Sequence, residues 1–331
     1  MASDKQLGRR AVLGDFASLG LAATLGGGFS SRDSRKLDRA ERSAAGRAKR
    51  VVYIHLAGGP SQHDLLDYKP VLAGYDGKPC PQELLDGQRF AFLAGHPKLL
   101  ASPFRFGQHG ASGAWVSELL PHFARVVDKV CIIRSMVTPE FNHAPAQLFA
   151  QTGSPRLGRP SMGAWVHYAL GSENQDLPGF VVLVSGGKTP SAGKSVWGSG
   201  FLPSVHAGVP FRSGREQVLY LADPAEIPRA RRLRSVELAR RLEGLRYATE
   251  GHEDIISHGA MRELATRMQR SVPAVCDLSA EPTWVHELYG HRSEADTFAR
   301  NCLIARRLLG TGVRFVQLYD WGWDSHGTSP S

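Results

Sequence analysis

Runs of apolar residues alternate with amphipathic segments along most of the chain. Short apolar runs rich in β-branched residues predict four buried strands, at residues 51–57, 129–134, 180–185 and 313–319. Elsewhere the apolar positions recur with helical spacing. This spacing predicts helices at residues 116–127, 144–151, 161–170, 228–272 and 295–310. A loop rich in Gly, Pro and Ser is expected between residue 186 and about residue 215.

The predicted strands are apolar on both faces and alternate with helices. This pattern is typical of an α/β fold in which a mainly parallel sheet lies between helices. The chain of 331 residues is 42% hydrophobic and 21% charged, which is typical of a globular protein with a substantial core. Ligands of such sheets bind beyond the carboxyl ends of the strands. Candidate functional residues are therefore sought in the loops that follow the strands.

Basic residues outnumber acidic ones, and the formal net charge is +9. Much of this excess lies in two segments, residues 32–50 and 229–246. A positive charge favours anionic partners. The sequence has neither zinc-finger spacing nor aromatic residues interleaved with the basic ones, so nucleic-acid binding is not expected.

The four cysteines do not form CxxC pairs, which argues against a thiolate zinc site. In an oxidising compartment they could form up to two disulfides. Cys131 lies in an apolar run and Cys302 in a helical pattern, so both are predicted to be buried as small hydrophobic residues.

The N-terminus has the layout of a targeting segment. Arg9 and Arg10 form a twin-arginine pair, followed by small and apolar residues from Phe16 to Leu25. Residues 1–28 are therefore interpreted as a twin-arginine-type signal, with the twin-arginine export machinery as a partner and a periplasmic or cell-surface location. An ordinary amphipathic N-terminal helix is the alternative. Residues 29–49 are interpreted as a basic linker and residues 50–331 as one α/β domain.

Polar side chains capable of chemistry gather in three segments that follow a predicted strand or open a predicted helix. Residues 58–70 directly follow the first strand, residues 141–153 lead into a helix, and residues 319–327 follow the last strand. The candidate side chains in these segments are Ser61, His63, Asp64, Asp67, Asn142, His143, Asp320, Asp324 and His326. We expect them to meet at one edge of the sheet.

Carboxylates and imidazoles at one sheet edge form a ligand set for a divalent ion such as Zn, Mn or Ca. A helix N-terminus beside them carries a partial positive charge that suits a phosphate or sulfate group. Each residue also has a plainer interpretation. Asp64 or Asp67 could cap a turn, His143 could cap a helix, and residues 324–326 could form a simple loop.

Two other catalytic patterns are not supported. The separation of Gly187 from Gly193 is one residue too long for a phosphate-binding P-loop. The segment around Ser61 lacks the second glycine of a serine hydrolase nucleophile elbow.

Three longer motifs resemble the DUF1501 family, and the resemblance covers roughly residues 50–331. The motifs are HLAGGPSQHDLLDYKP, FNHAPAQLFAQTG and FARNCLIARRLLGTGVRFVQLYDWGWDSHG. The family is grouped by fold with the sulfatases and alkaline phosphatases. The resemblance therefore implies a three-layer alkaline-phosphatase-like fold and the hydrolysis of sulfate or phosphate esters, with carbohydrate esters as one substrate class.

The resemblance also implies roles for particular residues. Asp64, with Asp67 as second choice, matches the metal ligand after the first strand, and Asp324 and His326 match later ligands. His63 would contact the ligand side chains without binding the metal itself. His143 stands at the nucleophile position and Gln147 at the arginine position of the sulfatase pattern, so ordinary sulfatase chemistry is not expected. Asn142 and His143 would instead contact the anionic group.

Proteins of this family normally continue with a further helix–strand unit and an Asp-His-His cluster. This chain stops at Ser331, so we expect its C-terminal part to be incomplete. Two functions follow as alternatives: a metal-dependent ester hydrolase, or an exported scaffold or binding protein that keeps the fold with an incomplete metal site.

Overall fold

The computed structural model describes residues 48–87, 95–186, 189–212, 217–218, 226–292 and 298–324. The predicted signal segment, most of the predicted linker and His326 lie outside these residues. Within the described residues, no helix is both long and apolar enough to cross a membrane.

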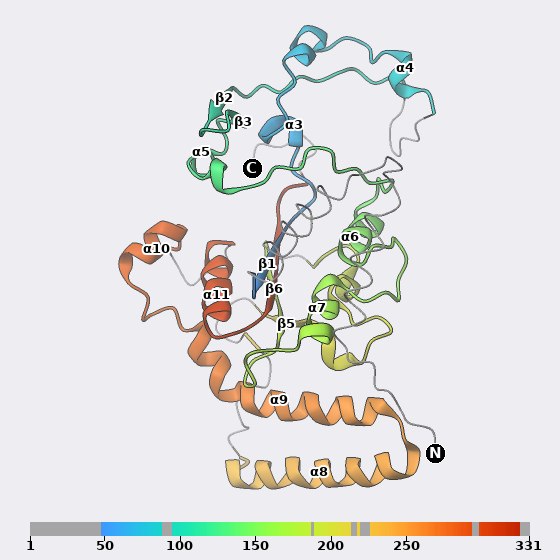
Figure 1. The fold of residues 1–331 in the computed structure, drawn as a ribbon, viewed down its shortest axis with the longest axis vertical. Coiled ribbons are helices and arrows are strands. Elements are labelled where there is room, and N and C mark those ends of the chain that lie inside the picture. The colour runs from blue at the N-terminus through green and yellow to red at the C-terminus, as the bar shows by residue number, and fades with distance from the viewer. Residues whose placement is uncertain are drawn as a thin grey trace, which may run out of the picture. The chain divides into compact units, whose positions relative to one another are not determined.

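The chain forms two compact units built from interleaved segments. The sheet unit contains the chain up to His55 together with Leu157–Thr189 and Gly193–Tyr319. The loop unit contains Leu56–Arg156, Pro190–Ala192 and Asp320–Ser331. Figure 1 follows the chain through both units.

The main sheet has the strand order β1-β6-β4-β5 and is mainly parallel, as predicted. Its strands are β1 (Val51–Ala57), β6 (Phe315–Trp321), β4 (Phe180–Ser185) and β5 (Val209–Phe211). The prediction did not include β5, because Pro210 and the surrounding glycines indicated a loop. β5 lies at an edge of the sheet, where a proline is tolerated since one side of the strand needs no partner.

One face of β4 packs into a hydrophobic cluster of the sheet unit. Val181 and Leu183 are almost fully buried and share this cluster with apolar residues of several helices. Among these helices are α9 (Glu253–Cys276) and α11 (Phe298–Gly310). Leu303 of α11, fully buried, is part of the same cluster.

The alternate residues of β4 point to the other face, because successive side chains of a strand alternate. There, α7 (Met162–Leu170) approaches Phe180 so closely that a Cβ on Gly163 would lie 2.5 Å from the Phe180 ring. Val182 meets Gly208 in the same way, since a Cβ at position 208 would lie 2.7 Å from the valine side chain. Helices therefore flank the sheet, which confirms the predicted α/β class.

The charged segment 228–272 forms a helical hairpin. α8 (Arg229–Glu250) ends at Gly251, whose φ of +68° reverses the chain before α9 begins. Figure 1 shows α8 alongside α9, with α9 between α8 and the sheet. The short helix α10 (Thr283–Tyr289) and the 3₁₀ turns Gly193–Trp197 and Ser204–His206 complete the sheet unit.

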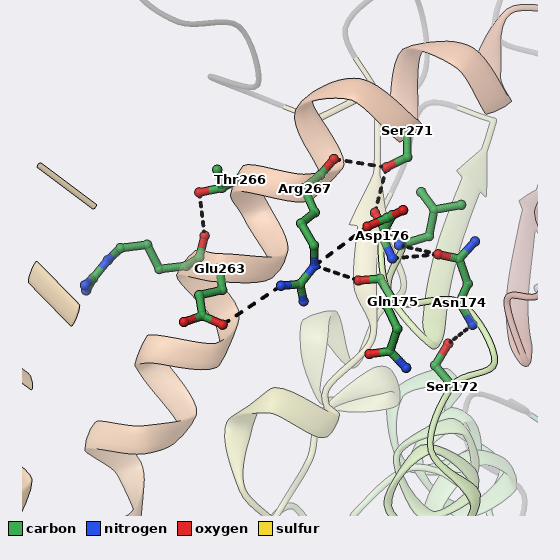
Figure 2. Close-up of polar contacts among 10 residues, drawn as sticks. Ser172, Asn174, Gln175, Asp176, Glu263, Thr266, Arg267 and Ser271 are labelled. Carbon is green, nitrogen blue, oxygen red and sulfur yellow. Dashed lines mark hydrogen bonds and ion pairs between the residues drawn. The ribbon is translucent and has the colours of Figure 1, made fainter. Parts of the chain in front are cut away.

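Polar contacts fix α9 to the loop that precedes β4 (Figure 2). Arg267 Nε donates to the carbonyl of Gln175 at 2.8 Å, and Ser271 Oγ donates to the carbonyl of Asp176 at 2.6 Å. Asn174 Oδ1 accepts from the Asp176 amide at 2.7 Å and so shapes the loop from within. The loop thus presents its carbonyl groups to α9, which anchors the hairpin.

The loop unit contains short elements. Its helices are α3 (Gln62–Leu65), α4 (Gln82–Leu85), α5 (Pro121–Ala124) and α6 (His143–Thr152), with 3₁₀ turns at Pro70–Tyr75 and Val127–Lys129. A two-stranded antiparallel sheet pairs β2 (Phe106–His109) with β3 (Ala114–Ser117).

Two predicted elements in the loop unit differ from the structure, although α5 lies inside the predicted helix at 116–127. The predicted helix at 116–127 begins instead as β3, because Gly110 and Gly113, both at positive φ, allow a hairpin turn before it. Tyr68 packs against Trp115 of this hairpin with ring centroids 4.5 Å apart. The predicted strand at 129–134 is irregular, and Ile133 within it is 61% exposed. An apolar run does not form a strand without a neighbour to pair with.

The cysteines also differ in part from the prediction. Cys131 is exposed and Cys302 is only partly buried, whereas Cys80 and Cys276 are buried. In the described part of the chain, none of the four forms a disulfide. Cys131 is exposed because the segment around it is not a strand.

Candidate functional site

The three predicted segments lie in the loop unit. Their described residues there are 58–70, 141–153 and 320–324. Gly58 follows β1 with a φ of +103° and lies directly against the backbone of Asp324. A Cβ at position 58 would be 2.3 Å from the Asp324 amide nitrogen. Only glycine therefore permits this approach of the first segment to the third.

The second segment also reaches Asp324. His143 Nε2 lies 3.4 Å from Asp324 Oδ2, and the two side chains are 46% and 38% exposed. Asn142 precedes this histidine as the N-cap of α6, and its side-chain oxygen accepts from the Ala144 amide at 3.3 Å. The cap residue is therefore Asn142, whereas His143, for which capping was the plainer interpretation, begins the helix. The three segments meet at Asp324.

The loop that carries Asp324 is braced by its own residues. Trp323 Nε1 donates to Asp320 Oδ2 at 2.9 Å, which engages one of the candidate carboxylates. Gly322, at a φ of +119°, turns the chain between them. Asp320 therefore helps to shape the loop, and Asp324 remains the carboxylate that faces His143.

The remaining candidates of the first segment lie around α3. Asp64 is in the first turn of this helix. Asp67 Oδ2 lies 3.1 Å from Lys69 Nζ and 3.8 Å from His63 Nδ1. Asp67 is therefore partly neutralised by a neighbouring lysine, a contact that the sequence pattern did not reveal.

Within the described residues, no group of three or more His, Cys, Asp or Glu side chains is arranged to hold a metal ion. His143 and Asp324 lie close together. Neither Asp64 nor Asp67 joins them to form a group of three possible ligands. His326, the other predicted ligand, lies outside the described residues. The metal-ligand roles of Asp64, Asp67, Asp324 and His326 stay predictions.

A cleft of about 430 Å³ borders the first segment. His63, Tyr68 and Lys69 line one part of it, and Phe104 and Arg105 line another. The described lining contains three basic side chains and no carboxylate. Its surface therefore suits a ligand with both an anionic group and an apolar face.

Sequence reasoning missed the contribution of Phe104 and Arg105 to this cleft. Both residues precede β2, and the hairpin that follows was not predicted, since a helix was expected from residue 116 onward. The signal was present in the glycines at positions 110 and 113, which separate two short alternating segments. A hairpin prediction would have placed Arg105 near Glu118, whose carboxylate it contacts at 2.8 Å.

Gln147, which stands at the arginine position of the sulfatase pattern, is buried and forms a hydrogen bond to the backbone. Gln147 is 3% exposed, and its Oε1 accepts from the Ala192 amide at 3.4 Å. The helix then ends as predicted, with Thr152 Oγ1 donating to the Leu148 carbonyl and Gly153 at a φ of +72°. Gln147 thus anchors α6 to a neighbouring segment of the loop unit.

The fold and these loops define an α/β protein with polar residues gathered beyond the ends of the outer strand β1 and the central strand β6. A family described as "Protein of unknown function (DUF1501)" matches residues 48–331. The chain belongs to the DUF1501 family. No curated protein and no solved structure matches it.

Proposed function

We propose that this chain is an exported, metal-dependent hydrolase-like protein with an alkaline-phosphatase-like fold, acting on sulfate or phosphate esters, including those of carbohydrates. The observation that supports this proposal best is the approach of His143 to within 3.4 Å of Asp324, where three distant segments meet. An exported location at the periplasm or cell surface, reached by the twin-arginine pathway, is part of the same proposal.

The spacing of this pair fits two ligands of one ion. Ligand atoms bound to a tetrahedral ion at about 2.0–2.2 Å lie about 3.3–3.6 Å from each other. The distance of 3.4 Å between His143 Nε2 and Asp324 Oδ2 falls in this range. A bound Zn, Mn or Ca ion would polarise an ester oxygen and lower the pKa of a bound water. Asp64, Asp67 and His326 are the proposed additional ligands.

The same region offers contacts for an anion. The N-terminus of α6 carries a partial positive charge, and His143 is the first residue of this helix. The cleft beside the first segment adds hydrogen-bond donors from Lys69 and Arg105, which also pair with Asp67 and Glu118. We therefore propose that Asn142 and His143 contact the transferred group, while the cleft holds the rest of the ester.

The proposal is tested by metal content and by hydrolysis. We expect the purified full-length chain to retain one or two divalent ions per molecule and to hydrolyse 4-nitrophenyl sulfate or phosphate. Asp324→Asn should remove metal and activity, because it takes away the carboxylate that faces His143. Glu287→Gln changes an exposed carboxylate on α10 and should alter neither.

Two results would overturn the proposed hydrolase function. One is a folded wild-type chain that binds no divalent ion and cleaves neither ester, which would favour the exported scaffold. The other is an Asp324→Asn variant with unchanged metal content and activity, which would place the site elsewhere.

A further inference from the structure

Helix α8 presents an exposed leucine stripe that no described element covers. Leu238, Leu242 and Leu245 are 59%, 57% and 69% exposed and lie one helical turn apart on the same face. No residue of this 22-residue helix is buried.

The opposite face of α8 accounts for its contact with α9. The partly buried positions Val236, Ala239, Glu243 and Tyr247 recur with helical spacing and point toward α9. Across this contact, Arg262 Nη2 donates to Glu243 Oε1 at 2.6 Å. The leucine stripe therefore faces away from the hairpin, because it lies on the other side of the helix.

Arginines flank the leucines on this outer face. Arg231, Arg234 and Arg241 all fall within about 70° of the stripe when residues are placed at 100° intervals around the helix axis. Arg241 pairs with Glu237 at 3.0 Å. In the described part of the chain, the side chains of Arg231 and Arg234 form no ion pair. The outer face thus combines apolar side chains with an uncompensated positive charge.

We propose that the outer face of α8 binds the surface of an anionic phospholipid bilayer, with the helix lying in the plane of the interface. Leucines with arginines around them are the kinds of side chain that an interfacial helix presents to an anionic membrane. Long arginine side chains can keep their charge at the phosphate groups while the leucines enter the acyl boundary. This inference does not depend on the proposed hydrolase activity.

A second copy of the chain fits the stripe less well. Helix pairing needs apolar residues at every seam position over three or more heptads. The leucines cover a single heptad, and the seam positions beyond them hold Arg231, Ser235 and Thr249. The charge on this face also favours an anionic surface over another copy with the same charge.

The test is co-sedimentation of the full-length chain with vesicles. We expect binding to vesicles of phosphatidylcholine and phosphatidylglycerol, little binding to phosphatidylcholine alone, and weakening as salt rises. The variant Arg231→Gln/Arg234→Gln/Arg241→Gln should bind about 100-fold more weakly, since each arginine near an anionic surface adds roughly a fivefold gain. Leu238→Ser/Leu242→Ser/Leu245→Ser should also weaken binding.

The control is a triple variant of equal net charge, Arg125→Gln/Arg134→Gln/Arg156→Gln, which changes exposed arginines of the loop unit. It should bind like the wild type, and circular dichroism should show that every variant is folded. Equal weakening in the control would overturn the proposal in favour of general charge attraction. Absence of vesicle binding, or a dimer that the leucine variant abolishes, would overturn it as well.

Discussion

Strand β4 and the loop that carries Asp324 are held in place in different ways. Val181 and Val182 of β4 are fully buried between helices on both faces of the sheet. His143 and Asp324 are 46% and 38% exposed, and a glycine contact and two polar contacts hold their surroundings. The stability of this chain therefore resides mainly in the sheet unit, while its candidate chemistry lies where little apolar surface is buried.

Truncating the core of the sheet unit should have the largest effect. Leu303→Ala, at a fully buried position, should lower the free energy of unfolding by about 3 kcal/mol, because it removes buried methyl groups and leaves a cavity. Leu245→Ala, at a position 69% exposed, should change it by less than about 0.5 kcal/mol. Urea denaturation measures the free energy of unfolding of both variants. Equal losses would contradict the conclusion that stability resides in the buried core of the sheet unit.

The next effect concerns pH. Burial, with the positive charges of His206 and Arg314, lowers the pKa of His167 to about 4. The unfolded chain has the higher pKa and takes up the proton first as pH falls, so protonation favours unfolding. Stability should fall by about 2–3 kcal/mol between pH 6.5 and 4 through this residue.

His167→Gln should flatten that part of the stability curve, measured by urea denaturation at several pH values. Leu303→Ala serves as the control, because it should lower the whole curve while keeping its pH dependence. A curve that keeps its slope in His167→Gln would show that other groups cause the acid sensitivity.

The smallest effect should come from the loop unit. Gly58→Ala should destabilise by about 2 kcal/mol, because a Cβ would be forced to 2.3 Å from Asp324 in addition to the strain of a positive φ. Gly59→Ala has a positive φ of +75° but open space, so it should cost only about 1 kcal/mol. Thermal denaturation of both variants gives the difference, and an equal cost would mean that the loops do not pack as described.

The sequence predicted the sheet unit well because burial on both faces leaves a clear pattern. The strand at 180–185 was predicted at its exact bounds, and Gly153 marked the end of α6 as expected. The loop unit was harder, because its short elements depend on turn geometry and on neighbours distant in sequence. The hairpin around Gly110 was therefore missed, and an unpaired run at 129–134 was taken for a strand.

For the candidate site, the rule that loops gather at the ends of parallel strands predicted that the three segments meet, and they do so at Asp324. It did not specify the individual contacts. The pairing of Asp67 with Lys69 depends on how the chain leaves α3, and the engagement of Asp320 by Trp323 depends on a turn at Gly322. Contacts of this kind follow from backbone conformation, which hydrophobic periodicity does not encode.

The close approach of Gly163 to Phe180 has an evolutionary consequence. Because a Cβ at position 163 would lie 2.5 Å from the Phe180 ring, neither position can enlarge while the other stays as it is. Across the family, a bulkier residue in α7 should therefore be accompanied by a smaller one at the start of β4. The two alignment columns should covary, and a chimera that takes them from different relatives should fold poorly unless they match.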